Sequence, residues 1–440
     1  MKEILLLTSL ISFLPALYPM KKVFKKVDLI FFDLLLLSHT LYFSFIPLKS
    51  AITGEFEYIK RIDSYDIINT SIYYTCFAIV LLFIDIYWTR KKHHTFPLNI
   101  TKYIANTPPL FFNKKSLLLI IFCLALSAIF YLPNASTAIR NELEGDSRNI
   151  WAIYWGTIFN WVNALIALNL CWTIKYKKLN TNSVLLFISA LVLSSFASRR
   201  DFVELILLFL LFFYSLCKKY ITLKTVSIFS ICIFLIYTIY FPFYNVIRWN
   251  TITFNSKAPI ESFIQIIDYG IGNWGYESKN AVETSKSREL GLYSAVAHLI
   301  KNDNDFQYGS LTLKAIDYAL PSAINPSKGK GTETFLEEKS KAFVDIADSV
   351  LYLSYGEFYI IGFLYAAFLF YFIGLILQKT GLIFYKKTNS HLYNIFIIIS
   401  FFSIAWNIEQ KLDGLIAMLF MIIIYFIIMQ TLKIHKYINF

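Results

Sequence analysis

Cysteine and charged residues are both scarce in this chain. Of 440 residues, five are Cys and only 16% are Asp, Glu, Lys or Arg. The cysteines all fall within apolar runs, at Cys76, Cys123, Cys171, Cys217 and Cys232, which excludes a disulfide framework and a thiolate metal site. The low charge, with 57% hydrophobic and 18% aromatic residues, excludes a soluble domain of this length. The composition predicts an all-α polytopic membrane protein.

Several other signals are missing. No repeat of fixed period is visible and the hydropathy of the two halves does not mirror, which argues against a secondary transporter. The KGKG segment lacks the spacing of a phosphate-binding P-loop and is typical of a flexible linker. The chain also has no nucleic-acid-binding motif and no segment in which basic residues alternate with aromatic ones, so no nucleic acid partner is expected.

Long apolar runs recur along the chain, and each is close to the roughly 20 residues that a helix needs to cross a bilayer. The first run is expected to be a membrane helix and not a cleaved leader, because its basic start is poor and no small-residue cleavage site follows. Asp33, His39 and Asp85 fall within runs and are expected to face the bundle interior. We predict eleven transmembrane helices, at 3–19, 27–48, 67–89, 116–133, 151–174, 183–198, 201–217, 225–243, 351–377, 392–408 and 414–432.

The charges in the connecting loops predict the orientation. Alternate loops hold 21 of the 41 Lys and Arg residues and none of the 29 acidic ones, at 20–26, 90–115, 175–182, 218–224, 378–390 and 433–440. Lysine and arginine in short loops stay cytoplasmic. These loops are therefore expected inside, and the amino terminus outside.

Residues 244–350 are the only large polar segment. They separate a predicted bundle of eight helices (1–243) from one of three (351–440) and are expected on the outer face. Apolar spacing within this loop predicts short amphipathic helices at APIESFIQIIDYG, RELGLYSAVAHLI and SLTLKAIDYAL.

Arginine is distributed unevenly. Seven of the eight arginines face outward under this topology, whereas the inner loops use lysine almost exclusively. The planar guanidinium binds phosphate through two parallel hydrogen bonds, which lysine cannot do. Arg199 and Arg200 are predicted in a short outer turn and Arg248 at the next outer helix end, so we expect the three to bind a pyrophosphate at membrane level. The alternative is local pairing with Asp201 and Glu204.

Three titratable residues of the outer loop are candidate catalytic groups. Asp345 and Asp348 lie one helical turn apart before the ninth span, where a carboxylate can act as general base toward a hydroxyl. The alternative is a charge that favours the helix dipole. His298 is the only histidine in a predicted outer segment. Its imidazole can act as a base, and the alternative is a structural role.

Two segments of the chain resemble a known family. The segments FQYGSLTLKAIDYALPSAINPSKGKG and DIADSVLYLSYGEFYIIGFLYAAFLFYFIG, with the Arg-containing turn near residues 195–204, are similar to Wzy-type O-antigen polymerases. The recurring family positions correspond to residues 309–321 and to Asp348, Ser349, Tyr352 and Gly356. The pattern of an arginine followed eleven residues later by glycine, found in some members, is absent.

The resemblance implies a GT-C-like membrane architecture and a metal-independent glycosyltransferase without cofactor. Such enzymes act at the periplasmic face of the bacterial inner membrane. They transfer a growing glycan from undecaprenyl pyrophosphate to a new lipid-linked repeat unit. The implied partners are undecaprenyl-pyrophosphate-linked oligosaccharides, a chain-length regulator, a flippase of the same pathway and membrane lipid.

Other functions remain open from the sequence. An O-antigen ligase shares the arginines and the long loop and differs mainly in its acceptor. A polysaccharide flippase or transporter is the alternative from a different class. A glycosyltransferase that uses polyprenyl monophosphate sugars is a further alternative, because Glu55-Phe56-Glu57 has the form of its acidic motif.

Overall fold

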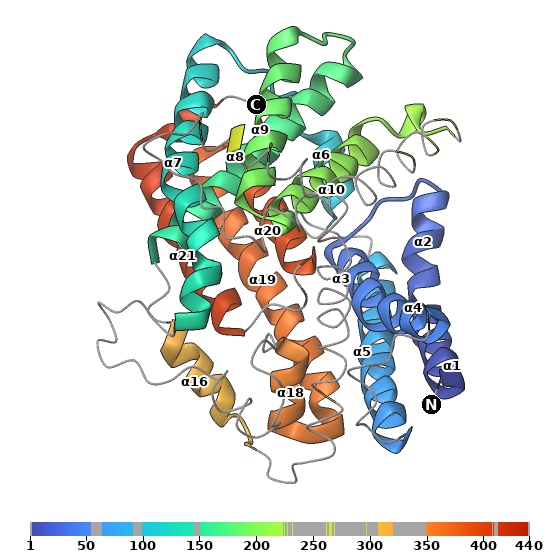
Figure 1. Ribbon diagram of the computed structural model, residues 1–440. Helices are drawn as coiled ribbons and strands as arrows, with labels where there is room; N and C mark the ends of the chain where they lie inside the picture. The colour runs from blue at the N-terminus through green and yellow to red at the C-terminus, as the bar shows by residue number, and fades with distance from the viewer. Residues whose placement is uncertain are drawn as a thin grey trace. The chain divides into compact units, whose positions relative to one another are not determined.

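A computed structural model gives the arrangement of the helices (Figure 1). It describes residues 2–53, 64–90, 99–144, 150–222, 307–319, 349–406 and 412–438, with single residues between some of these segments. The described residues are helical, without β-strands. The predicted span at 225–243 and the predicted loop helices at 258–270 and 288–300 lie outside the described segments. The α-helices are α1 (Lys2–Phe13), α2 (Leu17–Phe24), α3 (Phe31–Thr40), α4 (Ile46–Thr53), α5 (Ser64–Arg90), α6 (Ile100–Asn106), α7 (Lys114–Glu144), α8 (Ile150–Lys175), α9 (Thr181–Ala197), α10 (Arg199–Leu216), α16 (Ser310–Ala319), α18 (Val350–Phe358), α19 (Gly362–Thr388), α20 (Leu392–Trp406) and α21 (Leu412–Thr431).

The membrane class predicted from composition is confirmed. Among the described residues, seven helical stretches are long and apolar enough to cross a bilayer, namely Glu3–Phe24, Phe31–Lys49, Ile68–Trp88, Lys114–Leu132, Trp155–Lys175, Val350–Thr388 and Leu412–Thr431. Helices α9 and α20 are apolar but shorter. Helix α10 is not in either group, because four of its first six residues are charged. The protein is therefore an all-α polytopic membrane protein, and the full count of eleven spans stays a prediction.

The contacts divide the chain into two compact units, each built from separate stretches of sequence. Unit 1 comprises Met1–Ile100, Ser285–Asn389 and Ser400–Ile428, and unit 2 comprises Thr101–Thr284, Ser390–Ile399 and Met429–Phe440. The predicted boundaries near residues 243 and 350 mark where the outer loop begins and ends along the sequence. They describe a different kind of division from these two units and stay a prediction.

In unit 1, α5 packs against α1, α3 and α19. Its aromatic residues Tyr73, Tyr74 and Phe77 are fully buried, and the Tyr74 ring stacks on Phe43 at 4.1 Å between centroids. Asp33, His39 and Asp85 are fully buried as well. The expectation that these three polar residues face the protein interior is therefore confirmed.

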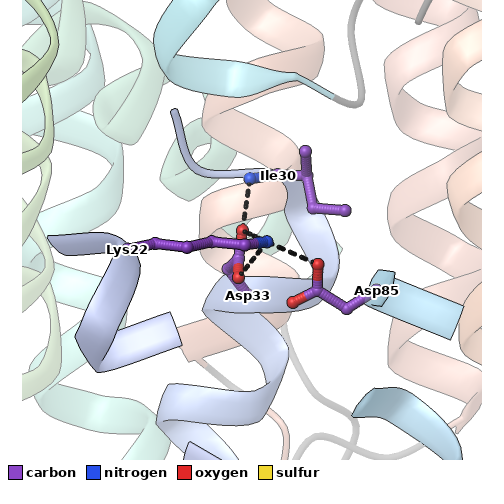
Figure 2. Close-up of polar contacts among 4 residues, drawn as sticks. All are labelled: Lys22, Ile30, Asp33 and Asp85. Atoms are coloured by element: carbon purple, nitrogen blue, oxygen red, sulfur yellow. Dashed lines mark hydrogen bonds and ion pairs between the residues drawn. The ribbon is translucent and has the colours of Figure 1, made fainter. Parts of the chain in front are cut away.

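The first membrane helix extends further than predicted. The chain stays helical from Lys2 through the 3-10 turn η1 (Leu14–Ala16) to Phe24, whereas the predicted span ends at residue 19 and is followed by a lysine loop. Lys22, which the prediction places in that loop, lies on α2 with only 6% exposure. Burial is possible because its ammonium group pairs with two carboxylates of the same unit (Figure 2).

The predicted single span at 351–377 is not one continuous helix. Tyr359 has a backbone φ of 56°, which ends α18, and α19 begins after the short 3-10 helix η5 (Tyr359–Ile361). In a continuous helix, residues 354 and 362 would lie about 12 Å apart. Instead, a Cβ atom added to Gly362 would lie 2.1 Å from the carbonyl oxygen of Ser354. The chain therefore folds back on itself here, and glycine permits the close approach.

Unit 2 is organised around α8, which packs against α7, α9 and α10. Polar side chains on α8 join it to its neighbours. The Asn163 amide donates to Ser194 Oγ at 3.0 Å, and Asn169 donates to the Leu110 carbonyl at 3.0 Å. At the start of α20, His391 Nδ1 lies 2.5 Å from the hydroxyl of Tyr103, and burial lowers the pKa of its imidazole.

Candidate functional site

The first candidate site joins the two segments that carry the family resemblance. The backbone N–H groups of Gln307 and Tyr308 donate to the carbonyl oxygens of Gly356 and Glu357, both at 3.3 Å. Tyr308 and Gly309 then take positive φ angles of 45° and 94°, and α16 begins at Ser310. The predicted helix at SLTLKAIDYAL is thus confirmed, and it starts at a backbone turn held against the end of α18.

The carboxylate of Glu357 caps this helix from a distant part of the sequence. One oxygen accepts the N–H of Gly309 at 2.5 Å, and the other accepts the N–H of Thr312 at 2.6 Å and its hydroxyl at 2.9 Å. Glu357 is fully buried. A negative charge at a helix amino terminus satisfies free N–H groups and interacts favourably with the helix dipole. The carboxylate therefore has an anchoring role at this junction.

Helix α19 completes the junction. The hydroxyls of Thr312 and Tyr365 lie 2.8 Å apart, and the ring of Tyr365 packs edge-on against Phe358 at 4.9 Å between centroids. The amino-terminal turn of α16, the end of α18 and the start of α19 are consequently held together (Figure 1).

Helix α18 places three of the family positions. Ser349 caps the helix, because its hydroxyl accepts the N–H of Tyr352 at 3.1 Å. Tyr352 is buried, at 2% exposure. The carbonyl oxygen of Gly356 accepts the hydrogen bond from the backbone N–H of Gln307. The hydroxyl of Tyr73 on α5 donates to the Leu351 carbonyl at 2.7 Å. These residues have structural roles in fixing α18 within unit 1.

The second candidate site is the arginine turn of unit 2. Only Ser198 separates α9 from α10, so Arg199 and Arg200 lie in the first turn of α10 and not in a separate loop as predicted. The Ser198 hydroxyl accepts the N–H of Asp201 at 2.9 Å and donates to its carboxylate at 2.8 Å. The Arg200 side chain is exposed.

Arg200 makes no close ion pair with an acid in the described part of unit 2. Asp201 is buried at 6% exposure and receives the Tyr131 hydroxyl at 2.8 Å in addition to Ser198. Arg200 forms no ion pair within 4 Å among the described residues, although Glu204 lies four residues further along the helix. The charge of Arg200 still acts on the buried Asp201, and its exposed side chain is accessible to a ligand.

The other predicted site residues are not placed. Asp345, Asp348, His298 and Arg248 lie outside the described residues, and for Arg199 only the helical backbone is described. The structure therefore neither gathers these groups nor separates them.

Sequence reasoning missed Glu357 and treated Asp201 only as a pairing partner. Glu357 is a single acid in an otherwise uncharged apolar run, which is a signal for a functional or structural carboxylate. Ser198 and Asp201 have the three-residue spacing of a capping box. Both signals were present, but neither reveals the partner that each carboxylate binds.

The comparisons with known proteins do not assign the chain to a family. No family model, no curated protein and no solved structure matches it.

Proposed function

We propose that this protein polymerises lipid-linked oligosaccharides at the outer face of a bacterial inner membrane, as the resemblance to Wzy-type polymerases implies. The observation that carries the proposal is the junction at Glu357. Two segments resemble the family, and the carboxylate of Glu357 joins them by binding Gly309 and Thr312, which lie 48 and 45 residues earlier in the chain. Residues that recur for a shared function are expected to meet in space.

The junction defines where the outer loop meets the membrane helices. Residues 320–348 connect α16 with α18, two helices that pack against each other. Asp348 directly precedes Ser349, the cap of α18, and Asp345 lies three residues before Asp348. In the proposed reaction, one of these carboxylates takes the proton of the acceptor hydroxyl.

The arginine turn supplies the electrostatic part of the proposal. Arg200 is exposed in the first turn of α10, where the helix dipole also favours an anion. The acceptor hydroxyl attacks the anomeric carbon of the growing glycan. The bond from that carbon to the pyrophosphate breaks, and undecaprenyl pyrophosphate leaves with both electrons. Guanidinium groups stabilise the negative charge that develops on this leaving group.

Substitution of the arginines tests this assignment. Arg199→Ala and Arg200→Ala are expected to abolish chain extension at a normal protein level, measured as the ladder of polymer lengths on a gel. Arg200→Lys keeps the charge but loses the bidentate geometry, and should give a shortened ladder. The matched control is Lys219→Ala, which removes an exposed cation after the opposite end of α10. Normal ladders from both alanine variants would remove the arginines from the proposal.

Deletion of the whole protein distinguishes the alternatives. Loss of a polymerase leaves the lipid A-core carrying one repeat unit, and loss of a ligase leaves none attached. Loss of a flippase strands the repeat units on the cytoplasmic leaflet. Only the first phenotype supports the proposed activity.

A further inference from the structure

Helix α16 carries two large apolar side chains that the protein leaves exposed. Leu313 is 68% exposed and Ile316 is 40% exposed. Another side of the same helix is covered, because Leu311 and Ala315 are fully buried. Residues three apart on a helix are neighbours, so Leu313 and Ile316 form one apolar strip on the surface. The helix thus has a buried apolar side and an exposed apolar side.

The polar residues of α16 lie along a separate side of the helix. Ser310, Lys314 and Asp317 follow one another at spacings of four and three residues, and the last two are exposed. With 3.6 residues per turn, this polar strip lies beside Leu313 and away from the buried Ala315. A helix with buried, apolar and polar sides is suited to a boundary where protein, hydrocarbon and water meet.

The contacts of α16 place it at one end of a membrane helix. Its first turn is held by Glu357, and the Thr312 hydroxyl lies 2.8 Å from that of Tyr365. Tyr365 lies in the first turn of α19, whereas Lys386 and Lys387 lie in its last turn. Since α19 is about 40 Å long, its two ends reach opposite boundaries of the bilayer. Helix α16 therefore starts at the boundary opposite these two lysines, beside α18 (Figure 1).

The side of α19 that faces lipid begins at the same junction. Large apolar side chains are exposed at spacings of three and four residues, at Ile361, Leu364, Phe368 and Phe372. Such a strip is unusual on a protein surrounded by water, and it belongs here to a stretch long and apolar enough to cross a bilayer. Leu364 directly precedes Tyr365, and Leu313 directly follows Thr312. The exposed apolar strips of α16 and α19 are therefore continuous with the two bonded hydroxyls.

We propose that α16 is an interfacial helix, with Leu313 and Ile316 inserted among the acyl chains of one bilayer leaflet. Lys314 and Asp317 then lie among the lipid headgroups and water. Tyr308, in the turn before α16, is exposed, and tyrosine is enriched at membrane boundaries. The occupant of this surface is phospholipid. The contact anchors the start of the outer loop to the bilayer and does not depend on the proposed glycan transfer.

Depth-dependent fluorescence quenching tests the proposal on the full-length protein in phosphatidylcholine vesicles. In a chain whose five cysteines are replaced by alanine, Leu313→Cys is labelled with bimane. Substitution of one exposed side chain is expected to leave the fold intact. A lipid with a spin label near its headgroup should quench this bimane several-fold more strongly than a lipid labelled near the end of its acyl chain. Iodide in the water should quench it weakly.

Two matched positions calibrate the measurement. Lys314→Cys, on the polar strip one residue further on, should be quenched by iodide and little by either lipid. Phe372→Cys lies about 15 Å along α19 from its first residue, so the label near the acyl chain end should quench it best. Quenching at position 313 by iodide and not by lipid would place Leu313 in water and overturn the proposal. Protection from both quenchers would place it against protein, with the same consequence.

Photocrosslinking identifies the occupant without a fluorescent probe. A photoreactive phenylalanine analogue is incorporated at position 313 or 314 of the otherwise unchanged protein, and the adducts formed in the vesicles are identified by mass spectrometry. Phospholipid adducts are expected at position 313, several-fold more abundant than at position 314. Adducts at position 313 with peptides, from this chain or from another copy, would assign the strip to a protein contact and overturn the proposal.

Discussion

At the scale of single residues, Glu357 has the clearest role in the described part of the chain. Its two carboxylate oxygens receive the N–H groups of Gly309 and Thr312 and the Thr312 hydroxyl. These contacts join a loop segment to a membrane helix. An acid that is fully buried and used in this way is a positioning residue and not a free general base.

We predict that Glu357→Ala destabilises the protein by about 1–3 kcal/mol, since partly buried N–H groups lose their acceptor. Glu357→Gln should be almost as harmful, because an amide has only one oxygen and directs its NH₂ group toward the second donor. The measurement is the thermal unfolding midpoint together with the polymer ladder. Thr312→Ser, which keeps the hydroxyl, is the control. Wild-type stability of Glu357→Gln would contradict the capping role.

The arginine turn illustrates what single residues reveal from sequence. The residue types and the adjacency of Arg199 and Arg200 predicted an anion site, and the structure describes Arg200 as exposed. Whether the arginines instead pair with Asp201 or Glu204 depends on where these side chains point, which the sequence does not show. Asp201 binds Ser198, as their three-residue spacing predicts, but it also binds Tyr131, which no spacing rule predicts because Tyr131 lies on another helix, 70 residues earlier.

At the scale of elements, hydropathy predicted the positions of most helices but not the break within one of them. The run from Val350 to Thr388 has a high mean hydropathy, so a hydropathy profile treats it as one span. The break depends on Tyr359, a non-glycine residue at positive φ, and on the contact of Gly362 with Ser354. Such a break is decided by packing, and apolar residues continue on both sides of it.

We predict that Gly362→Ala disrupts the turn between α18 and α19. Its methyl group would lie 2.1 Å from the backbone oxygen of Ser354, which cannot rotate away as a flexible side chain does. The expected loss is several degrees in the unfolding midpoint, with reduced chain extension. Ile361→Ala is the control, because this neighbouring side chain is 61% exposed. Equal midpoints for the two variants would show that the helices do not fold back as described.

At the scale of the whole molecule, the topology predicted from charge places the two ends of α10 on opposite sides of the membrane. The 18 residues of α10 span about 27 Å, close to the thickness of the hydrocarbon core. Its charged residues are confined to the first turns at one end and to Lys218 and Lys219 beyond the other. The helix is thus consistent with a span whose charges lie at both surfaces.

Accessibility labelling tests this orientation. In a chain whose five cysteines are replaced by alanine, a membrane-impermeant thiol reagent added outside should label the Arg200→Cys variant and not the Lys219→Cys variant. Permeabilised membranes should give labelling of both variants, which controls for reactivity. Exclusive labelling of Lys219→Cys from outside would invert the topology and remove the outer arginine site.

The sequence by itself determined the class of protein and its predicted orientation. Hydrophobicity and loop charge act locally, on each segment's transfer into the bilayer, and can be read without knowledge of contacts. Tertiary structure decided which buried charges meet. Glu357 binds residues 45 and 48 positions earlier, and Lys22 binds Asp85, 63 positions away. The free energy of a buried charge depends on the partner that packing brings to it, and this partner is not encoded in any one segment.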